Sequence, residues 1–310
     1  MFFYSSSFQD IDLLRDSVIE WNLEVFPLEV RSLGYEIKQA VTSNFLIGEG
    51  NFSCKTEQRG ATPKGFRTFV IPANDSVHYN WRGRHLHGNC LSLFPENGEL
   101  HSISNHTFHV YTVSFHQSLF EVACETIQSK RLDHSVRGEN VWLVEYHVMN
   151  TLRELARAIL FRSSLNKPIQ YLQQRLLKEI LLAIRDSEER RPRTGNLKKH
   201  SIIKKASDWM RERISEPAPL SDLYQELSVS ERAAQIAFKD QFGLSLKTYY
   251  KNYRLMKVRE ALRKANHDRT VSDIAAKFGY WHLGQFSKDY KNVVGELPST
   301  TLKNAYPRLN

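Results

Sequence analysis

Two stretches in the last third of this sequence place side chains that can bind nucleic acid on one face of a short helix. The outward positions of the first stretch, at helical spacing, are Arg232, Gln235, Ile236 and Lys239. Those of the second stretch are His282, Gln285, Ser287 and Lys288. Arginine and glutamine can pair with base edges in the major groove, and lysine can contact phosphates. This chemistry favours two recognition helices.

Each stretch also has an apolar stripe that would fix such a helix to its scaffold. The first stripe is Ala234, Phe238 and Phe242, and the second is Leu283, Phe286 and Tyr290. A helix with one apolar and one polar face packs on its apolar side and exposes the other. The pattern therefore predicts two helices held by aromatic cores.

The elements around these helices form an internal repeat. The segment LSDLYQELSVS (220–230) aligns with VSDIAAKFGYW (271–281), and the segments GLSL and GELP follow at a similar offset. Thr270 and Asp273 have the spacing of a capping box at the start of a helix. The repeat predicts two helix-turn-helix units, at about 220–242 and 271–294, with a connecting helix near 247–264.

The charge of the chain is divided unevenly. The net charge is +9 for the whole sequence, −1 for residues 1–186 and +10 for residues 187–310. A basic segment of this kind is typical of a domain that approaches a polyanion. Duplex DNA is therefore the expected partner of the C-terminal part.

The preceding residues predict a different architecture. Short β-branched and aromatic runs at 45–115 indicate an antiparallel sheet or barrel, and helical spacing at 140–185 indicates a helical hairpin interrupted at Asn166, Lys167 and Pro168. Residues 187–197 have few apolar side chains and are expected to form a linker. The predicted fold class is α+β with two domains: a β-barrel, cupin-like sensor or dimerisation domain with a helical hairpin at 1–186, and an all-α domain with two helix-turn-helix units at 198–310.

The C-terminal motifs resemble the DNA-binding domain of the AraC/XylS family of transcription regulators. The resemblance covers about 201–302 and depends on SERAAQIAFKDQFGLSLKTYYKNYRL and on VSDIAAKFGYWHLGQFSKDYKNVVGELPS. The stretch GYWHLGQF is similar to the branch that includes the ethanolamine operon regulator. The resemblance implies two recognition helices in successive major grooves, with base-facing positions at Arg232, Gln235, Ile236, Leu283, Gly284, Gln285 and Lys288.

The resemblance also implies a regulator without catalytic activity, whose N-terminal domain senses an effector or mediates dimerisation. The expected partners are double-stranded promoter DNA, a small-molecule effector, a second copy of the chain and RNA polymerase. An effector pocket could be lined by Arg67, His78, Trp81, Arg82 and Arg84. No cofactor is expected. No secretion signal or membrane span is visible, which predicts a cytoplasmic protein.

An alternative is a metal-dependent, cupin-type enzyme fused to a DNA-binding module, because the N-terminal part is rich in histidine. The pair His85 and His87 lacks the glutamate that a site with two histidines and one carboxylate needs, since the next acidic residue is Glu96. No metal site is therefore predicted. Cys54, Cys90 and Cys124 have no spacing typical of a zinc site or a disulfide framework, and buried thiols are expected.

Overall fold

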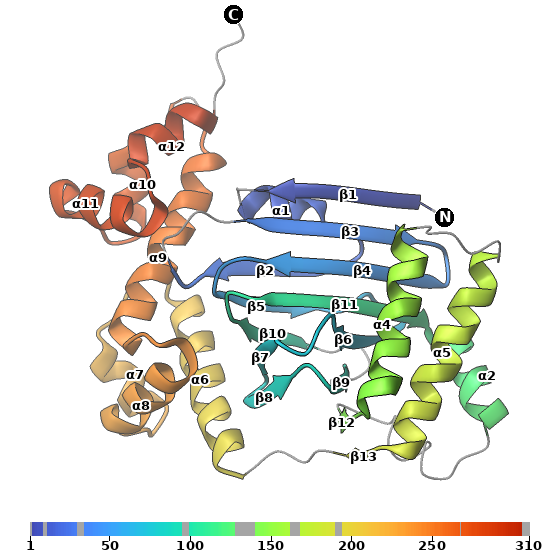
Figure 1. The fold of residues 1–310 in the computed structure, drawn as a ribbon. Helices are drawn as coiled ribbons and strands as arrows, with labels where there is room; N and C mark the ends of the chain where they lie inside the picture. Colours follow the sequence, from blue (N-terminus) through green and yellow to red (C-terminus); the bar gives the residue numbers. More distant parts are fainter. Residues whose placement is uncertain are drawn as a thin grey trace, which may run out of the picture. The chain divides into compact units, whose positions relative to one another are not determined.

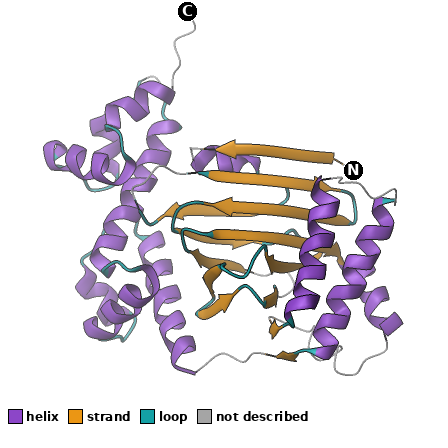
Figure 2. Cartoon of the chain, viewed as in Figure 1, coloured by secondary structure: helices purple, strands orange, loops and turns teal. Residues whose placement is uncertain are grey.

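The computed structural model describes residues 2–8, 11–29, 34–94, 99–127, 140–161, 168–189, 194–266 and 268–305. The chain divides into two compact units. The first comprises Met1–Pro27 and Arg31–Pro192, and the second comprises Leu28–Val30 and Arg193–Asn310. Figure 2 shows that strands dominate the first unit, whereas the second consists of helices.

The first unit contains two antiparallel sheets. Among the described residues, one sheet has eight strands in the order β1-β3-β4-β11-β6-β9-β12-β13, and the other has five in the order β2-β5-β10-β7-β8 (Figure 1). The strands of the larger sheet are β1 (Phe2–Phe8), β3 (Tyr35–Val41), β4 (Phe45–Phe52), β6 (Phe66–Pro72), β9 (Cys90–Leu93), β11 (Phe108–His116), β12 (Asn140–Leu143) and β13 (Glu188–Glu189). Those of the smaller sheet are β2 (Asn22–Pro27), β5 (Thr56–Ala61), β7 (His78–Trp81), β8 (Arg84–His87) and β10 (Glu99–Ser104).

The two faces of the larger sheet have different neighbours. Along β4, Phe45 and Ile47 point to one face and join a core with helices α2 (Gln117–Ile127), α4 (Tyr146–Phe161) and α5 (Ile169–Asp186). Gly48 and Gly50 occupy the alternate positions, which face a cavity shared with the smaller sheet. The unit therefore has three layers, with helices on one side of the larger sheet and the smaller sheet on the other.

The predicted helical hairpin is present, but it begins later than the sequence indicated. Asn140–Leu143 forms strand β12, which pairs with β9, and Leu143 is exposed rather than part of a helical stripe. A strand of four residues, with Val141 and Trp142 both buried, was too short to distinguish from a helix by periodicity. Asn166 and Lys167 lie outside the described residues. Helix α1 (Ile11–Ser17), helix α2 and strands β1 to β3 were not predicted from the sequence.

The second unit contains the helix-turn-helix pairs. Its helices are α6 (Thr194–Glu212), α7 (Leu220–Glu226), α8 (Glu231–Phe242), α9 (Leu246–Arg263), α10 (Val271–Lys277), α11 (Leu283–Val294) and α12 (Pro298–Ala305). Helix α9 contacts both the α8 side and the α10–α12 side of the unit. The fold class predicted from the sequence is confirmed.

The segment expected to be a linker is more ordered than its composition suggested. Within 187–197, the residues Glu188–Glu189 pair with β12 as strand β13, and helix α6 already begins at Thr194. Strand pairing of this kind uses backbone groups, so it does not need apolar side chains.

The part of the chain that the structure describes has no helix long and apolar enough to cross a membrane. The thiols of Cys54, Cys90 and Cys124 are buried, as predicted.

Candidate DNA-binding surface and sensor cavity

The first recognition helix, α8, is fixed at both ends and along its inner face. The Ser230 hydroxyl accepts a hydrogen bond from the Ala233 amide at 3.2 Å, and Gly243 ends the helix in the left-handed conformation with φ 75°. Phe238 and Phe242 are buried, with ring centroids 5.2 Å apart. The predicted inward stripe, including Ala234, is therefore confirmed.

The outer face of α8 carries three exposed side chains. Arg232 and Lys239 are exposed, and Ile236 retains 45% of its accessible surface. The Lys239 ammonium donates to the Gly243 carbonyl at 3.1 Å, at the end of the helix. This face can present one guanidinium, one ammonium and one apolar group to a ligand.

The Gln235 side chain forms hydrogen bonds within the second unit. Its Oε1 accepts a hydrogen bond from the Leu246 amide at 3.3 Å, and its Nε2 donates to the Tyr224 hydroxyl at 3.5 Å. The side chain is half-buried. Gln235 is therefore less free than its predicted place on the polar face suggested, because its amide connects α8 to the first turn of α9 and to α7; its contact with a base stays a prediction.

The second unit has the capping box that the sequence predicted. The Thr270 hydroxyl accepts from the Asp273 amide at 3.2 Å, and the Asp273 carboxylate accepts from the Thr270 amide at 3.0 Å. The hydrogen bond from the Thr270 backbone, followed by that from its side chain, lowers the pKa of Asp273. Helix α10 therefore begins at a defined residue and sets the position of the turn before α11.

The second recognition helix, α11, presents a longer exposed face. Phe286 and Tyr290 are buried, and the Tyr290 and Thr301 hydroxyls lie 2.8 Å apart. The exposed outward residues are His282, Gly284, Gln285 and Lys288, and Ser287 is half-buried. The prediction that Leu283 packs inward is wrong, because the side chain is 42% exposed in the first turn, before the buried stripe begins.

Trp281 is a candidate that the sequence reasoning missed. It directly precedes α11 and is 76% exposed. A large aromatic side chain exposed beside a recognition helix can contact a sugar, a base or a protein partner. Its signal in the sequence was a large aromatic residue at the last position of the repeat, where the first unit has the small polar Ser230.

Helix α9 joins the two helix-turn-helix pairs rigidly. Arg254 donates to the Phe278 carbonyl at the end of α10, and its guanidinium carbon lies 4.5 Å from the Tyr280 ring centroid. Figure 1 shows the α7–α8 pair and the α10–α11 pair toward opposite ends of α9. The 18 residues of α9 extend about 27 Å at ~1.5 Å per residue.

Lys257 of α9 and Lys264, which directly follows the helix, are partly neutralised by an acidic residue of the unit. Burial acts to raise the pKa of Glu260, but hydrogen bonds and charges from Lys264 and Lys257 outweigh it and lower the pKa to about 2. The Lys264 and Lys257 ammonium nitrogens lie 2.8 Å and 3.1 Å from the carboxylate oxygens. These two cations are less available to phosphates than the exposed Arg232 and Lys288.

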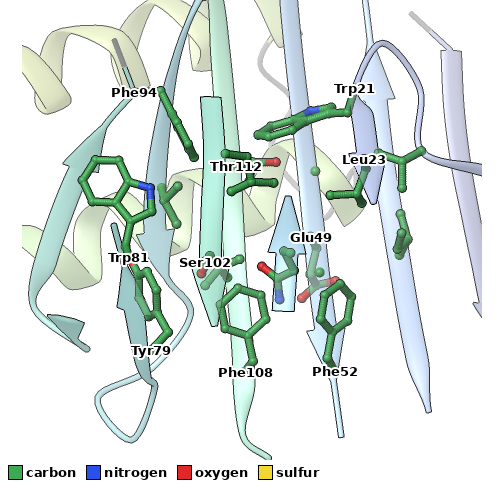
Figure 3. Close-up of a pocket in the computed structure, with 18 of the residues that line it drawn as sticks. Trp21, Leu23, Glu49, Phe52, Tyr79, Trp81, Phe94, Ser102, Phe108 and Thr112 are labelled. Atoms are coloured by element: carbon green, nitrogen blue, oxygen red, sulfur yellow. The ribbon is translucent and has the colours of Figure 1, made fainter. Parts of the chain in front are cut away.

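The first unit encloses a cavity of about 100 Å³ between its two sheets. That space exceeds the room of a single water molecule several-fold. Figure 3 shows aromatic side chains from both sheets around it, with Trp81 and Tyr79 on one side and Phe108 and Phe52 on the other. A concave cavity lined mainly by apolar and aromatic side chains is typical of a small-molecule site.

The predicted effector-pocket residues are largely outside this cavity. Trp81 is the one of the five that lines it. Arg67 lies on the helix side of the larger sheet, with its guanidinium carbon 5.6 Å from the Phe120 ring centroid. His78 stacks on His85, and Arg82 and Arg84 belong to the β7–β8 hairpin. Polar type alone could not indicate which face of a strand each residue occupies. The missed lining residues include Trp21, Phe52, Tyr79, Phe94, Ser102 and Phe108.

The histidines of the first unit are distributed over separate contacts. His101 is buried with its Nε2 3.0 Å from the Glu57 carboxylate, and burial followed by the charge of Arg59 lowers the pKa of His101. His109 lies 2.8 Å from the Glu49 carboxylate. Among the described residues, no three His, Cys, Asp or Glu side chains gather in a way that could hold a metal ion. Glu96 lies outside those residues, and the enzyme alternative finds no support.

Comparison with known proteins agrees with the geometry of the second unit. Residues 223–304 match a family described as a helix-turn-helix domain. Over 96 residues the chain is 30% identical to the XylDLEGF operon transcriptional activator of Pseudomonas putida, covering 31% of this chain and 30% of that protein. It is 28% identical over 103 residues to the probable thc operon regulatory protein of Rhodococcus erythropolis, covering 33% of this chain and 31% of that protein. The matched part thus spans about a third of the length of these two relatives.

Two further comparisons extend over most of the chain. The chain is 25% identical over 243 residues to the HTH-type transcriptional activator RhaR of Pectobacterium atrosepticum, covering 73% of this chain and 82% of that protein. The solved structure of the AraC-like transcriptional activator CuxR covers 89% of this chain and 99% of its own, at 8% identity and a TM-score of 0.44. The resemblance to AraC-type regulators that the C-terminal motifs predicted is confirmed.

Proposed function

We propose that this chain is a sequence-specific, DNA-binding transcription regulator of the AraC/XylS type, acting in the cytoplasm by binding and without catalysis. The observation that carries the proposal is the pair of recognition helices, α8 and α11, each with a buried aromatic stripe and an exposed face that bears a base-reading or phosphate-binding group. The matched relatives described as transcriptional activators support activation as the mode of control.

The length of α9 supports the use of two successive major grooves. Successive grooves on one side of B-form DNA are about 34 Å apart, and the ~27 Å length of α9 is of the same order. Arg232 from α8 and Gln285 from α11 are exposed and can each read a base pair. We expect their contacts to lie about 10 base pairs apart.

The test is a binding selection on randomised duplexes with the full chain and with single variants. Arg232→Ala and Gln285→Ala should each relax the preference at one or two base pairs, and the two positions should be about one helical turn apart. The binding constant should also fall linearly with the logarithm of salt concentration, because phosphate contacts release counterions. Loss of preference at the same base pairs in both variants would show that the two-groove assignment is wrong.

The first unit is proposed to control this binding through an effector in its cavity and through pairing of two protomers. The leucine stripes of α4 and α5 do not supply a dimer contact, because Leu152, Leu172 and Leu176 are buried in the core of the unit. Phe161 and Tyr171 remain, 45% and 46% exposed, near the facing ends of the two helices. We propose that this end of the hairpin contributes to the dimer contact.

Sedimentation of the full chain tests this assembly. Phe161→Ser together with Tyr171→Ser should lower the dimer fraction, whereas Val122→Ser, at an exposed position on α2, should leave it unchanged. A single-species monomer for the unsubstituted chain at tens of micromolar, with and without DNA, would remove the dimer from the proposal. Recruitment of RNA polymerase is a separate part of the proposal, and transcription from the selected DNA site measures it.

A further inference from the structure

Two polar groups in the cavity wall have no hydrogen-bond partner. The indole nitrogen of Trp81 and the hydroxyl of Ser102 are buried and unsatisfied within the described residues. The two residues are 1% and 4% exposed. Figure 3 shows the nitrogen-bearing edge of Trp81 turned toward the other labelled side chains of the cavity. Buried donors without partners are rare in folded proteins, so an acceptor that reaches them is expected.

Other polar side chains of the wall are already satisfied by the protein. The Gln39 Oε1 accepts a hydrogen bond from the Ile19 amide at 3.1 Å, and the Gln58 Nε2 donates to the Thr56 hydroxyl at 3.0 Å. These amides hold the wall in place and do not need a ligand. The unsatisfied donors of Trp81 and Ser102 therefore distinguish one part of the wall from the rest.

The charge of the wall is also satisfied. Glu49 is the one charged residue among the described residues that line the cavity. Its carboxylate oxygens lie 2.8 Å from the His109 Nε2 and 3.0 Å from the Lys38 Nζ. The Glu49 carboxylate lies with these partners on the helix side of the larger sheet, where Lys38 also contacts the Phe161 ring. Because no Lys, Arg or His belongs to the described lining, an anionic ligand in the cavity would be buried without a cation of its own.

The remaining surface of the cavity fits a ring. Phe94 lies edge-on to both Trp81 and Trp21, with centroid distances of 5.3 Å and 6.0 Å, and Tyr79 meets Phe108 in the same way at 5.6 Å. Such edge-to-face surfaces favour a further aromatic or cyclic group.

We propose that the cavity binds a neutral, ring-bearing small molecule with a hydrogen-bond acceptor, such as a carbonyl oxygen, that receives the Trp81 indole N–H. The Ser102 hydroxyl forms a second hydrogen bond with the same molecule. This inference rests on the proposed function in one respect, since the bound molecule would be the effector that controls DNA binding.

Gly50 provides the space for such a molecule. A side-chain carbon added at Gly50 would meet only the Phe52 ring, at 3.8 Å, whereas one added at Gly48 would lie 2.9 Å from the Thr112 hydroxyl. A leucine at Gly50 would therefore extend into the cavity and occupy the ligand's place.

Titration calorimetry of the full chain with three ligands of similar size tests the chemistry. The ligands are acetophenone (neutral, with a carbonyl), ethylbenzene (neutral, without one) and benzoate (anionic). Acetophenone should bind about 3- to 10-fold more tightly than ethylbenzene, since one hydrogen bond contributes that much, and benzoate should bind most weakly. Gly50→Leu should abolish binding of all three.

The Trp81→Phe variant keeps the ring and removes the donor. It should weaken acetophenone about 3- to 10-fold and leave ethylbenzene unchanged. Trp142→Phe is the matched control, because the Trp142 indole nitrogen is also buried without a partner but lies in the core between the larger sheet and the helices. It should leave both affinities unchanged. If Trp81→Phe does not fold, Ser102→Ala gives the second measurement, with the same selective loss expected.

Three results would overturn the inference: benzoate binding as tightly as acetophenone, Trp81→Phe weakening ethylbenzene as much as acetophenone, or no binding of any of the three. DNA binding, measured on the same preparations, separates the two proposals. A chain that binds DNA but not acetophenone refutes only the ligand class. A chain that binds acetophenone but no DNA refutes the proposed regulator.

Discussion

The two helix-turn-helix pairs have the same arrangement of helices. They differ in how many polar side chains of the recognition helix are hydrogen-bonded within the protein. Both recognition helices end at a glycine with positive φ, and both bury two aromatic side chains. In α8, the Ser230 cap and the Gln235 amide are hydrogen-bonded within the unit. In α11, His282 provides no side-chain cap, and Gln285 is exposed.

This difference indicates a division of work between the pairs. A side chain that already braces the fold cannot turn to a base without breaking its internal hydrogen bonds, whereas an exposed glutamine can pair with adenine at no such cost. We therefore expect Arg232 to make the main base contact of α8. We expect α11 to contribute more of the preference for particular DNA sequences.

The largest effect is expected where the two pairs are alike. Phe238→Ala and Phe286→Ala should each destabilise the second unit by about 3–5 kcal/mol, because each leaves a cavity in a buried aromatic core. Both should weaken binding to all DNA sequences together. Denaturant unfolding followed through the second unit's transition measures the loss, with the exposed Leu283→Ala as a control within about 0.5 kcal/mol. A small loss in only one of the two would mean that the pairs are not equivalent scaffolds.

Alanine substitutions of Gln235 and Gln285 should show most clearly how the two helix-turn-helix pairs differ. Gln285→Ala should lower affinity for the best site by about 1–3 kcal/mol, with little effect on random DNA or on stability. Gln235→Ala should instead lower stability by about 1 kcal/mol, since it removes the hydrogen bonds to Leu246 and Tyr224. Binding selections and unfolding curves for both variants check this, and equal changes in base preference would contradict the division of work.

The helix caps give a smaller effect on stability, and its size depends on pH. Thr270→Ala should cost about 1 kcal/mol at neutral pH, as Ser230→Ala should in the first pair. Because Thr270 lowers the folded-state pKa of Asp273, its contribution is present above the ordinary pKa of an aspartate and is lost as pH falls through the lowered value. The difference in stability between Thr270→Ala and the unsubstituted chain should therefore shrink below about pH 4. A difference that is constant from pH 7 to pH 2 would contradict this role of Asp273.

Gly284 gives the smallest effect and the sharpest test of how closely α11 approaches DNA. A side-chain carbon added there would meet nothing within 4 Å. Gly284→Ala should thus raise the stability of the second unit by about 0.5–1 kcal/mol through helix propensity. If the backbone of α11 lies against the DNA, the same variant should bind its site more weakly despite being more stable. Unchanged affinity would assign Gly284 no part in the contact.

The sequence by itself determined the elements whose evidence is local. The Thr270 capping box and the aromatic stripes predicted the recognition units because each depends on spacing within one or two turns of a helix. The repeat of this pattern, which can be read by aligning two segments of the chain, predicted that there are two such units. The excess of basic residues after residue 186 predicted a polyanion as partner for the same reason, since charge can be counted along the chain.

Only the tertiary structure decided which side chains are free to act. Gln235 and Gln285 were both predicted on the polar face of their recognition helix, yet the first is hydrogen-bonded within the unit because the start of α9 passes beside it. Trp81 and Arg67 were both predicted to line the effector pocket. The structure places Trp81, from the smaller sheet, in the cavity, whereas Arg67 lies on the helix side of the larger sheet. The physical reason is that burial and hydrogen bonding arise between segments far apart in the chain, and a linear spacing does not record which segment becomes the neighbour.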